Sequence, residues 1–416
     1  MATITAGRRT IAARVLGRLT FGPFSSQLDE AAELSPDALV SSVLARPALP
    51  APDRHPGEDT EEEWHAPVDW WLRRMADPAA GLHERMVWFW HGHLTSSVDK
   101  VGDWQLMWEQ HLLLRELAFG NVRELLQRVT TDRAMLWYLD GDHSWGEEPN
   151  ENYSRELMEL FAIGRGNYTE DDVRAGARAL SGWWVEWVDD GPGPARFDPD
   201  RHWGRPVPFL GTTVTTAADV VDAVCDHPAI GPFLAGALHE ALVGVAPSPE
   251  RGEQLGRVLV ANDLEVLPLV EAILEVPELR APEATRARTG AEWLVAAGAV
   301  FGGDSLLTRS AAENVGQMPF NPPNVSGWPA GPSWASSSQY LSRMELLSWP
   351  DAQPSLPDAG VDEVVEAVLQ GCALVDVRPE TRAALTAAAR SYPDDPESRS
   401  HLLHVLAVLS PEFAVV

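Results

Sequence analysis

The chain has 416 residues, a formal net charge of −29 and an apolar fraction of 45%, which is the balance of an ordinary folded protein with a large core. So acidic a chain lacks the basic surface that nucleic acids and anionic membranes attract, so we expect neither as a partner, and the charge favours a cationic partner or a metal ion. With only Cys225 and Cys372, a disulfide framework and a cysteine-based zinc site are both excluded.

The first segment, MATITAGRRTIAARVLGRLTFGPF, predicts a helix of the folded protein rather than an export signal. Its arginines, at Arg8, Arg9, Arg14 and Arg18, interrupt any apolar stretch of signal-peptide length. No run of about 18 apolar residues occurs anywhere in the chain, so we expect no membrane span. Together these features predict a cytoplasmic protein.

Apolar residues recur at helical spacing along most of the chain. The segment SPDALVSSVLARP begins with Ser35 as an N-cap, Pro36 in the first helical position and Asp37 in the first turn. The same spacing occurs in PVDWWLRRM, LHERMVWFWHGHL, HLLLRELA, VRELLQRV, LVEAILEV, AEWLVAAGAV and HLLHVLAVL. Strand patterns are sparse. The sequence therefore predicts an all-α fold, a large bundle-like domain of many helices, with at most a short hairpin near WWVEWV or FLGTTV.

Four segments interrupt the helical pattern: residues 50–63, 189–211, 317–334 and 350–362. Long loops in a folded domain are usually functional or disordered. The two middle segments carry Phe and Trp, so we expect them to be ordered against the body. The last one marks the boundary region between a main helical domain, residues 1–345, and a C-terminal helical segment, residues 346–416, that packs on the main body.

Two histidines, His91 and His93, stand in the segment WFWHGHLTSS directly after large aromatic residues. On a helix, positions i and i+2 point about 200° apart, so the two imidazoles would not share one ion. If the chain unwinds at Gly92, both can bind one ion, and together with carboxylates they would suit zinc, iron or manganese. The alternative is an ordinary helix end, with one imidazole hydrogen-bonded to the backbone and the other half exposed.

The segment PNENYSRELMELFAIGRGNYTEDDV, residues 149–173, concentrates charged and amide side chains around a short apolar run. We predict a helix over residues 150–163 that ends at Gly164, because glycine readily takes a positive φ. A second helix is expected to begin at Thr169, in a capping box with Asp172.

Four polar residues are expected on one face of the first helix, at about 100° per residue: Asn152, Arg155, Glu156 and Glu159. The like charges of Glu156 and Glu159 repel on an isolated helix. The pair belongs either to a solvated or arginine-paired structural face, or to an interior cavity where it holds a metal or a proton, as glutamates do in helical bundles with carboxylate metal sites.

One further candidate metal ligand is His202, in DPDRHWGRPVPFLG, although a lone loop histidine is more often structural. The chain contains no HExxH helix, no GxSxG elbow, no GxGxxG turn and no Walker loop. We therefore expect no nucleotide cofactor, and a divalent metal ion is the candidate cofactor.

The proline-rich segment FNPPNVSGWPAGPSW is expected to be rigid, because each proline restricts the residue before it. Asn321 and Asn324 can hydrogen-bond backbone groups that a loop leaves unpaired. Trp328 and Trp334 either line a pocket or anchor the loop to the body. Aromatic side chains of this kind also serve as platforms for sugars.

Several of these motifs, in this order, resemble a bacterial family known as domain of unknown function 1800. The resemblance covers most of the chain, from LGRLTFGPFSSQLDEA through WFWHGHLTSS, NENYSRELMELFAIGRGNYTEDDVRAGARALSGW, HPAIGPFLAGALHEALVG and MPFNPPNVSGWPAGPSW to LAVLSPEF. It implies a helical fold and a protein partner that resembles an alkaline phosphatase or a sulfatase. The positions that match the family's motifs are His91, His93, Asn152, Arg155, Glu156, Glu159, His202, Asn324 and Trp328.

This chain departs from the resemblance at two positions, because many relatives carry His where Phe161 stands and Asp where Trp203 stands. If those residues are ligands in relatives, the site is altered here.

Two hypotheses follow. In the first, the chain is a metal-assisted hydrolytic or oxidative enzyme: the two histidines at 91 and 93 bind the ion, Glu156 and Glu159 act as ligands or general base, Arg155 orients a carboxylate or an anion, and Asn152 donates a hydrogen bond. In the second, it is a non-catalytic helical scaffold that binds a partner protein or a glycan, and the polar cluster fixes helix packing.

Overall fold

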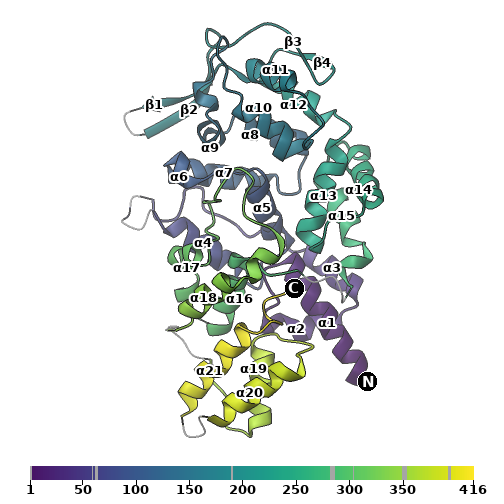
Figure 1. The fold of residues 1–416 in the computed structure, drawn as a ribbon, viewed down its shortest axis with the longest axis vertical. Coiled ribbons are helices and arrows are strands. Elements are labelled where there is room, and N and C mark those ends of the chain that lie inside the picture. Colours follow the sequence, from purple (N-terminus) through teal and green to yellow (C-terminus); the bar gives the residue numbers. More distant parts are fainter. Residues whose placement is uncertain are drawn as a thin grey trace.

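The computed structural model describes residues 2–58, 60, 64–188, 191–281, 286–302, 304–348, 354–391 and 395–416. Over these ranges, 21 α-helices and two short antiparallel hairpins account for nearly all regular structure, which confirms the predicted helical fold. The molecule is elongated, with the hairpins at one end and the last three helices at the other (Figure 1).

The first part of the chain contains the helices α1 (Ala2–Leu19), α2 (Ser25–Glu33), α3 (Pro36–Leu44), α4 (Ala66–Met75), α5 (Leu82–His93), α6 (Val98–Val101), α7 (Trp104–Glu116), α8 (Val122–Thr130) and α9 (Arg133–Tyr138). These helices run from α1, α2 and α3 in the lower half of the molecule up to α8 and α9 near the hairpins (Figure 1). The predicted start of α3 is confirmed, because the Ser35 hydroxyl accepts a hydrogen bond from the amide of Ala38 and Pro36 follows it. Residues 59 and 61–63 of the acidic segment lie outside the described residues.

The second part carries the hairpins. Its elements are α10 (Asn152–Glu156), a π-helix (Leu157–Ala162), α11 (Glu170–Leu180), β1 (Trp183–Val188), β2 (Gly191–Phe197), β3 (Val207–Phe209), β4 (Thr212–Val214) and α12 (Ala217–Cys225). The predicted capping box is present, since the side chain of Thr169 and that of Asp172 each accept from the other's backbone amide. Gly164 follows the π-helix with φ +78°, as predicted.

Both segments named as hairpin candidates form strands, so the structure has two hairpins where at most one was expected. β1 pairs with β2, and β3 pairs with β4. The prediction of one irregular loop over residues 189–211 is therefore wrong for the residues that form β2 and β3. Prolines occur in β2 because a two-stranded hairpin has open edges, where a missing N–H is tolerated. The β3–β4 turn uses Leu210 and Gly211, both with positive φ, as a two-residue turn that matches the strand twist requires.

The third part begins with three mutually packed helices, α13 (Ile230–Val243), α14 (Pro249–Ala261) and α15 (Val266–Leu274), along one side of the molecule (Figure 1). The remaining helices are α16 (Gly290–Phe301), α17 (Arg309–Asn314), α18 (Ser337–Leu346), α19 (Val361–Gly371), α20 (Pro379–Ser391) and α21 (Pro396–Val408). Residues 350–353 of the predicted linker lie outside the described residues. The last three helices pack on one another at the end of the molecule, and the division into two domains stays a prediction.

Candidate functional site

The side chain of His91 holds the proline-rich loop in place. Helix α5 continues through His93, so the chain does not unwind at Gly92, and the two imidazoles cannot share one ion. The Nε2 atom of His91 accepts a hydrogen bond from the amide of Phe320, at 2.9 Å. Phe320 has φ 66°, a conformation that costs a bulky residue free energy, and this hydrogen bond helps to hold it. Burial lowers the pKa of His91 to about 3, so the ring is neutral and its Nε2 lone pair is already used.

His93 links α5 to the π-helix. Its Nε2 atom lies 2.8 Å from the carbonyl oxygen of Phe161, near the C-terminal end of the π-helix, where backbone carbonyls run out of intrahelical donors. Its ring stacks on Phe89, with centroids 5.3 Å apart, and burial lowers its pKa. Both imidazoles thus bind backbone groups, whereas the alternative of an ordinary helix end gave only one of them such a partner.

The π-helix at Leu157–Ala162 changes which way the acidic side chains point. In a π-helix each hydrogen bond spans five residues instead of four, so residues advance by less than 100° each. The prediction that the polar residues share one face assumed α-helical spacing, so it does not hold for residues after Glu156.

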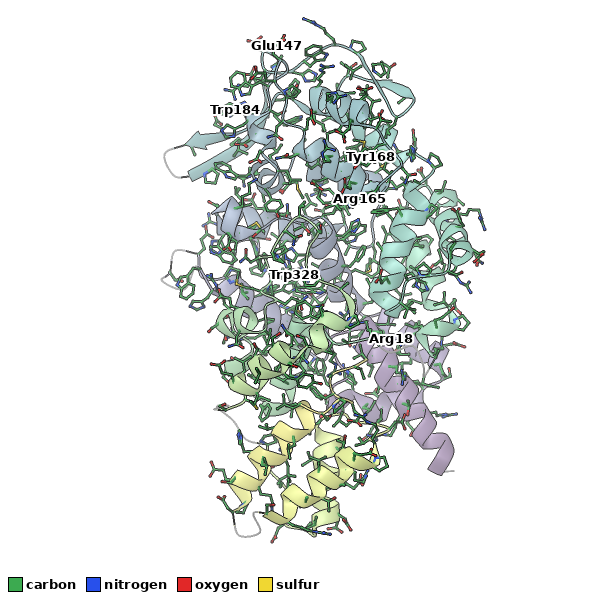
Figure 2. All side chains as sticks on the ribbon, viewed as in Figure 1. Arg18, Glu147, Arg165, Tyr168, Trp184 and Trp328 are labelled. Atoms are coloured by element: carbon green, nitrogen blue, oxygen red, sulfur yellow. The ribbon has the colours of Figure 1, made fainter. Side chains whose placement is uncertain are left out.

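Most polar residues of this segment have partners of their own. Glu159 accepts from Tyr168 and from Arg165, which lie side by side in Figure 2, and these hydrogen bonds lower its pKa. Arg155 instead binds Glu170, at 2.7 and 2.9 Å, and also Glu151. The side-chain amide of Asn152 donates a hydrogen bond to the carboxylate of Asp140, at 3.0 Å.

Glu156 is different, because it makes no side-chain hydrogen bond or ion pair among the described residues. Its side chain is half-buried. Burial and the neighbouring Glu159 raise its pKa. It is the one predicted site acid whose carboxylate is not already engaged in the described part of the chain.

The last predicted ligand, His202, lies in the hairpin region, between β2 and β3. The Nδ1 atom of His202 lies 2.9 Å from the carbonyl oxygen of Ser181. At the two positions that depart from the family resemblance, Phe161 is fully buried against Tyr153, and Trp203 packs against the guanidiniums of Arg178 and Arg205.

The structure does not bring the predicted ligand set of His91, His93, Glu156, Glu159 and His202 together into one group. Over the described residues, no three His, Cys, Asp or Glu side chains form a group able to hold a metal ion. The physical reason is that each of the three imidazoles is hydrogen-bonded to a backbone group, while Glu159 is held by its own neighbours.

The two aromatic segments singled out in the sequence do meet, and they form one wall of a cleft. The cleft has a volume of about 340 Å³ and lies between α5, α13 and the 317–334 loop. We call it the aromatic cleft, and its aromatic lining is Trp88, Phe89, His93, Trp328 and Trp334. Trp328, near the middle of the molecule in Figure 2, stacks on Trp88 with ring centroids 5.0 Å apart and planes 14° apart. Trp328 thus anchors the loop and also lines a pocket.

Polar groups face the same cleft. Glu240 on α13 is exposed at its edge and forms no ion pair within the described ranges. Gln317 accepts a hydrogen bond from the amide of Ala291 through Oε1, while its Nε2 has no partner among the described residues. Aromatic walls with a few separate donors and acceptors are the usual composition of a small-molecule site.

Behind the cleft, a buried ion-pair cluster joins α5 to α16. The Glu292 carboxylate accepts from both Nη atoms of Arg286, at 2.6 and 2.7 Å, from Arg85 and from the amide of Thr289. Glu292 is 3% exposed, and the positive charges of Arg286 and Arg85 outweigh burial and hold its pKa well below the usual range. This cluster fixes the floor of the cleft.

Sequence reasoning missed this cluster, because its two ends are 207 residues apart. One local sign of it was present, since Thr289 and Glu292 have the spacing of a capping box, which the structure forms.

A family model described as a protein of unknown function, DUF1800, matches residues 14–415. No curated protein and no solved structure matches the chain. Over the residues that the structure describes, no helix has both the length and the apolar character needed to cross a bilayer.

Proposed function

The chain belongs to the DUF1800 family of proteins of unknown function, and we propose that it is a non-catalytic helical binding protein whose aromatic cleft takes a carbohydrate. The observation that carries the proposal is the meeting of Trp88 and Trp328 at a cleft that also contains unengaged polar groups. A pyranose ring has an apolar C–H face that packs on an indole, and hydroxyls that need donors and acceptors nearby.

The size of the cleft favours a small ligand over a partner protein. Its volume of about 340 Å³ lies in the range of ligand sites, roughly 300–1,000 Å³. Protein partners instead need a surface of roughly 800 Å² on each side. The scaffold part of the hypothesis is supported by the histidines at 91 and 93, which fix loop and helix positions through backbone hydrogen bonds.

The test is a glycan array probed with the intact labelled chain, followed by titration of the best neutral oligosaccharide. Trp328→Ala should weaken binding about tenfold, since a stacked ring contributes up to roughly 1.5 kcal/mol beyond the area it buries. Trp145→Ala is the matched control, because Trp145 is an exposed tryptophan outside the cleft, 51% accessible. No bound neutral glycan, or equal affinity of the two variants, would contradict the proposal.

The metal-assisted enzyme is the alternative, and Glu156 is the observation that favours it, because its carboxylate is unengaged and its pKa is raised. The discriminating measurement is the metal content of untagged protein compared with that of Glu156→Ala. Stoichiometric metal that the variant loses would favour the enzyme, and negligible metal in both would end this alternative.

A further inference from the structure

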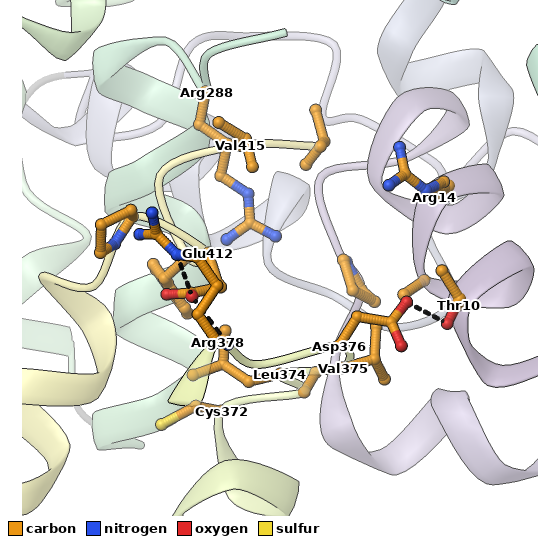
Figure 3. A pocket seen from close by; sticks show the side chains of 16 residues that line it. Thr10, Arg14, Arg288, Cys372, Leu374, Val375, Asp376, Arg378, Glu412 and Val415 are labelled. Carbon is orange, nitrogen blue, oxygen red and sulfur yellow. Dashed lines mark hydrogen bonds and ion pairs between the residues drawn. The ribbon is translucent and has the colours of Figure 1, made fainter. Parts of the chain in front are cut away.

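A second cavity, of about 370 Å³, lies between α1, the segment after α19 and the last residues of the chain. We call it the C-terminal cavity (Figure 3). Much of its wall is apolar, formed by Ala13, Pro23, Leu374, Val375, Phe413 and Val415. It shares no residue with the aromatic cleft. Three arginines also line it, and two of them are unusual.

Arg288 is 5% exposed, yet its charge is not neutralised by any ion pair among the described residues. Its Nη1 atom is buried without a hydrogen-bond partner, and its Nη2 atom makes only a long contact, 3.4 Å, to the carbonyl oxygen of Gly22. The guanidinium lies 4.6 Å from the ring centre of Phe413. In Figure 3 it points into the cavity.

Arg14, on α1, faces the same cavity from another side (Figure 3). Its Nε and Nη1 atoms are buried and have no partner in the described part of the chain. It forms no ion pair there either. Arg14 is half-buried as a residue, but buried guanidinium nitrogens without a hydrogen-bond acceptor are costly, so two such side chains at one cavity call for an external acceptor.

The acids that line this cavity are already engaged. Asp376 accepts from the hydroxyl of Thr10, at 2.5 Å. Glu412 is held by Arg378, at 2.8 Å, and by Thr381, at 3.0 Å. The negative charge of Glu292 also acts on Arg288, but the Glu292 carboxylate is already bound by Arg85 and Arg286.

We propose that the C-terminal cavity binds a small amphipathic organic anion. Its oxyanion head, a carboxylate or a phosphate, is held by Arg14 and Arg288, and its apolar body lies along Phe413 and Leu374. Guanidiniums bind these head groups with short, charge-assisted hydrogen bonds, which would supply the acceptors that both side chains lack. Burial and the positive charges of neighbouring arginines lower the pKa of Arg288 to about 10, and a bound anion would act in the opposite direction.

The test uses the full chain and calorimetric titration with three probes: octanoate, octyl phosphate and octanol. Inorganic phosphate is a fourth probe that lacks the apolar body. Wild type should bind at least one of the two amphipathic anions, and the stronger of them identifies the head group. Arg14→Gln should weaken that binding at least about tenfold. Arg8→Gln is the matched control, because Arg8 is an exposed arginine on the same helix outside the cavity.

Arg14→Gln should also unfold at a temperature no lower than wild type without ligand, since Arg14 has no ion-pair or hydrogen-bond partner among the described residues to lose. If this variant does not fold, Arg14→Lys is the second variant, which keeps the charge but loses the planar fork and should bind more weakly than wild type. Three results would overturn the proposal: neither amphipathic anion binds, octanol or inorganic phosphate binds as tightly as both of them, or the Arg14 variant binds like the Arg8 variant.

Discussion

Replacing Glu292 with glutamine should destabilise the protein by about 3–5 kcal/mol, the usual cost of leaving a buried charge without its partner. The carboxylate receives hydrogen bonds from two guanidiniums and one backbone amide while only 3% exposed. Glutamine has the same size, but its NH₂ group would face a guanidinium N–H, so donor would meet donor. Arg85 and Arg286 would then remain buried and positive with fewer acceptors.

The effect should depend on pH, with a sign that follows from the depressed pKa of Glu292. In the unfolded chain a glutamate takes up its proton near pH 4.3, whereas in the folded protein it does so at a much lower pH. The stabilisation is therefore fully present above about pH 5 and is lost as the pH falls toward the folded-state pKa. The difference between wild type and Glu292→Gln should shrink in the same direction.

The assay is urea unfolding followed by tryptophan fluorescence at pH 7 and pH 3.5. Glu240→Gln is the control, because Glu240 is an exposed glutamate at the edge of the same cleft, and its substitution should change stability by less than about 0.5 kcal/mol. Equal stability of the two variants at pH 7, or a deficit of Glu292→Gln that is unchanged at pH 3.5, would refute the role assigned to the Glu292 charge.

Three further predictions concern other buried groups. Because the pKa of His91 is lowered to about 3, wild type should lose stability as the pH falls from 6.5, and His91→Gln should show a shallower loss in urea midpoints between pH 6.5 and 4. Burial raises the pKa of Asp132, the N-cap residue of α9, to about 6, so this group favours the folded state as the pH falls from 6 to 4, and Asp132→Asn should lack that gain in the same titration. Burial also raises the pKa of Cys225 and of Cys372 to about 12, so Ellman's reagent at pH 8 should label neither thiol in the native protein and both after unfolding.

The helical fold could be predicted because its signals are local. Ser35 caps α3, Thr169 forms a capping box and Gly164 ends the preceding helix, and each of these depends on residues within one or two turns. The π-helix could not be predicted in this way. Its longer hydrogen bonds depend on tertiary contacts, such as that between His93 and the carbonyl of Phe161, 68 residues away.

The candidate site was predicted in part. The Trp-flanked segment and the proline-rich loop were both singled out, and Trp88 and Trp328 do stack. The structure does not bring the histidines and glutamates together as expected, because residue type and spacing do not reveal which backbone group an imidazole will bind. His91 contacts Phe320, 229 residues away, and no local pattern encodes that contact.

The net charge of the whole chain does not predict which ligands a particular cavity binds. A charge of −29 indicates repulsion of anions at long range, yet the buried charged residues that the structure describes include five arginines and only three acids, Asp69, Glu84 and Glu292. Exposed charges are screened by salt within about 10 Å, whereas buried ones act through a less polarisable medium. The potential inside a cavity is therefore set by the few charges that line it. Arg14 and Arg288 can therefore select an anion within an acidic protein. The acidic surface lowers the association rate of that anion, but it does not weaken the contacts that the anion makes in the cavity.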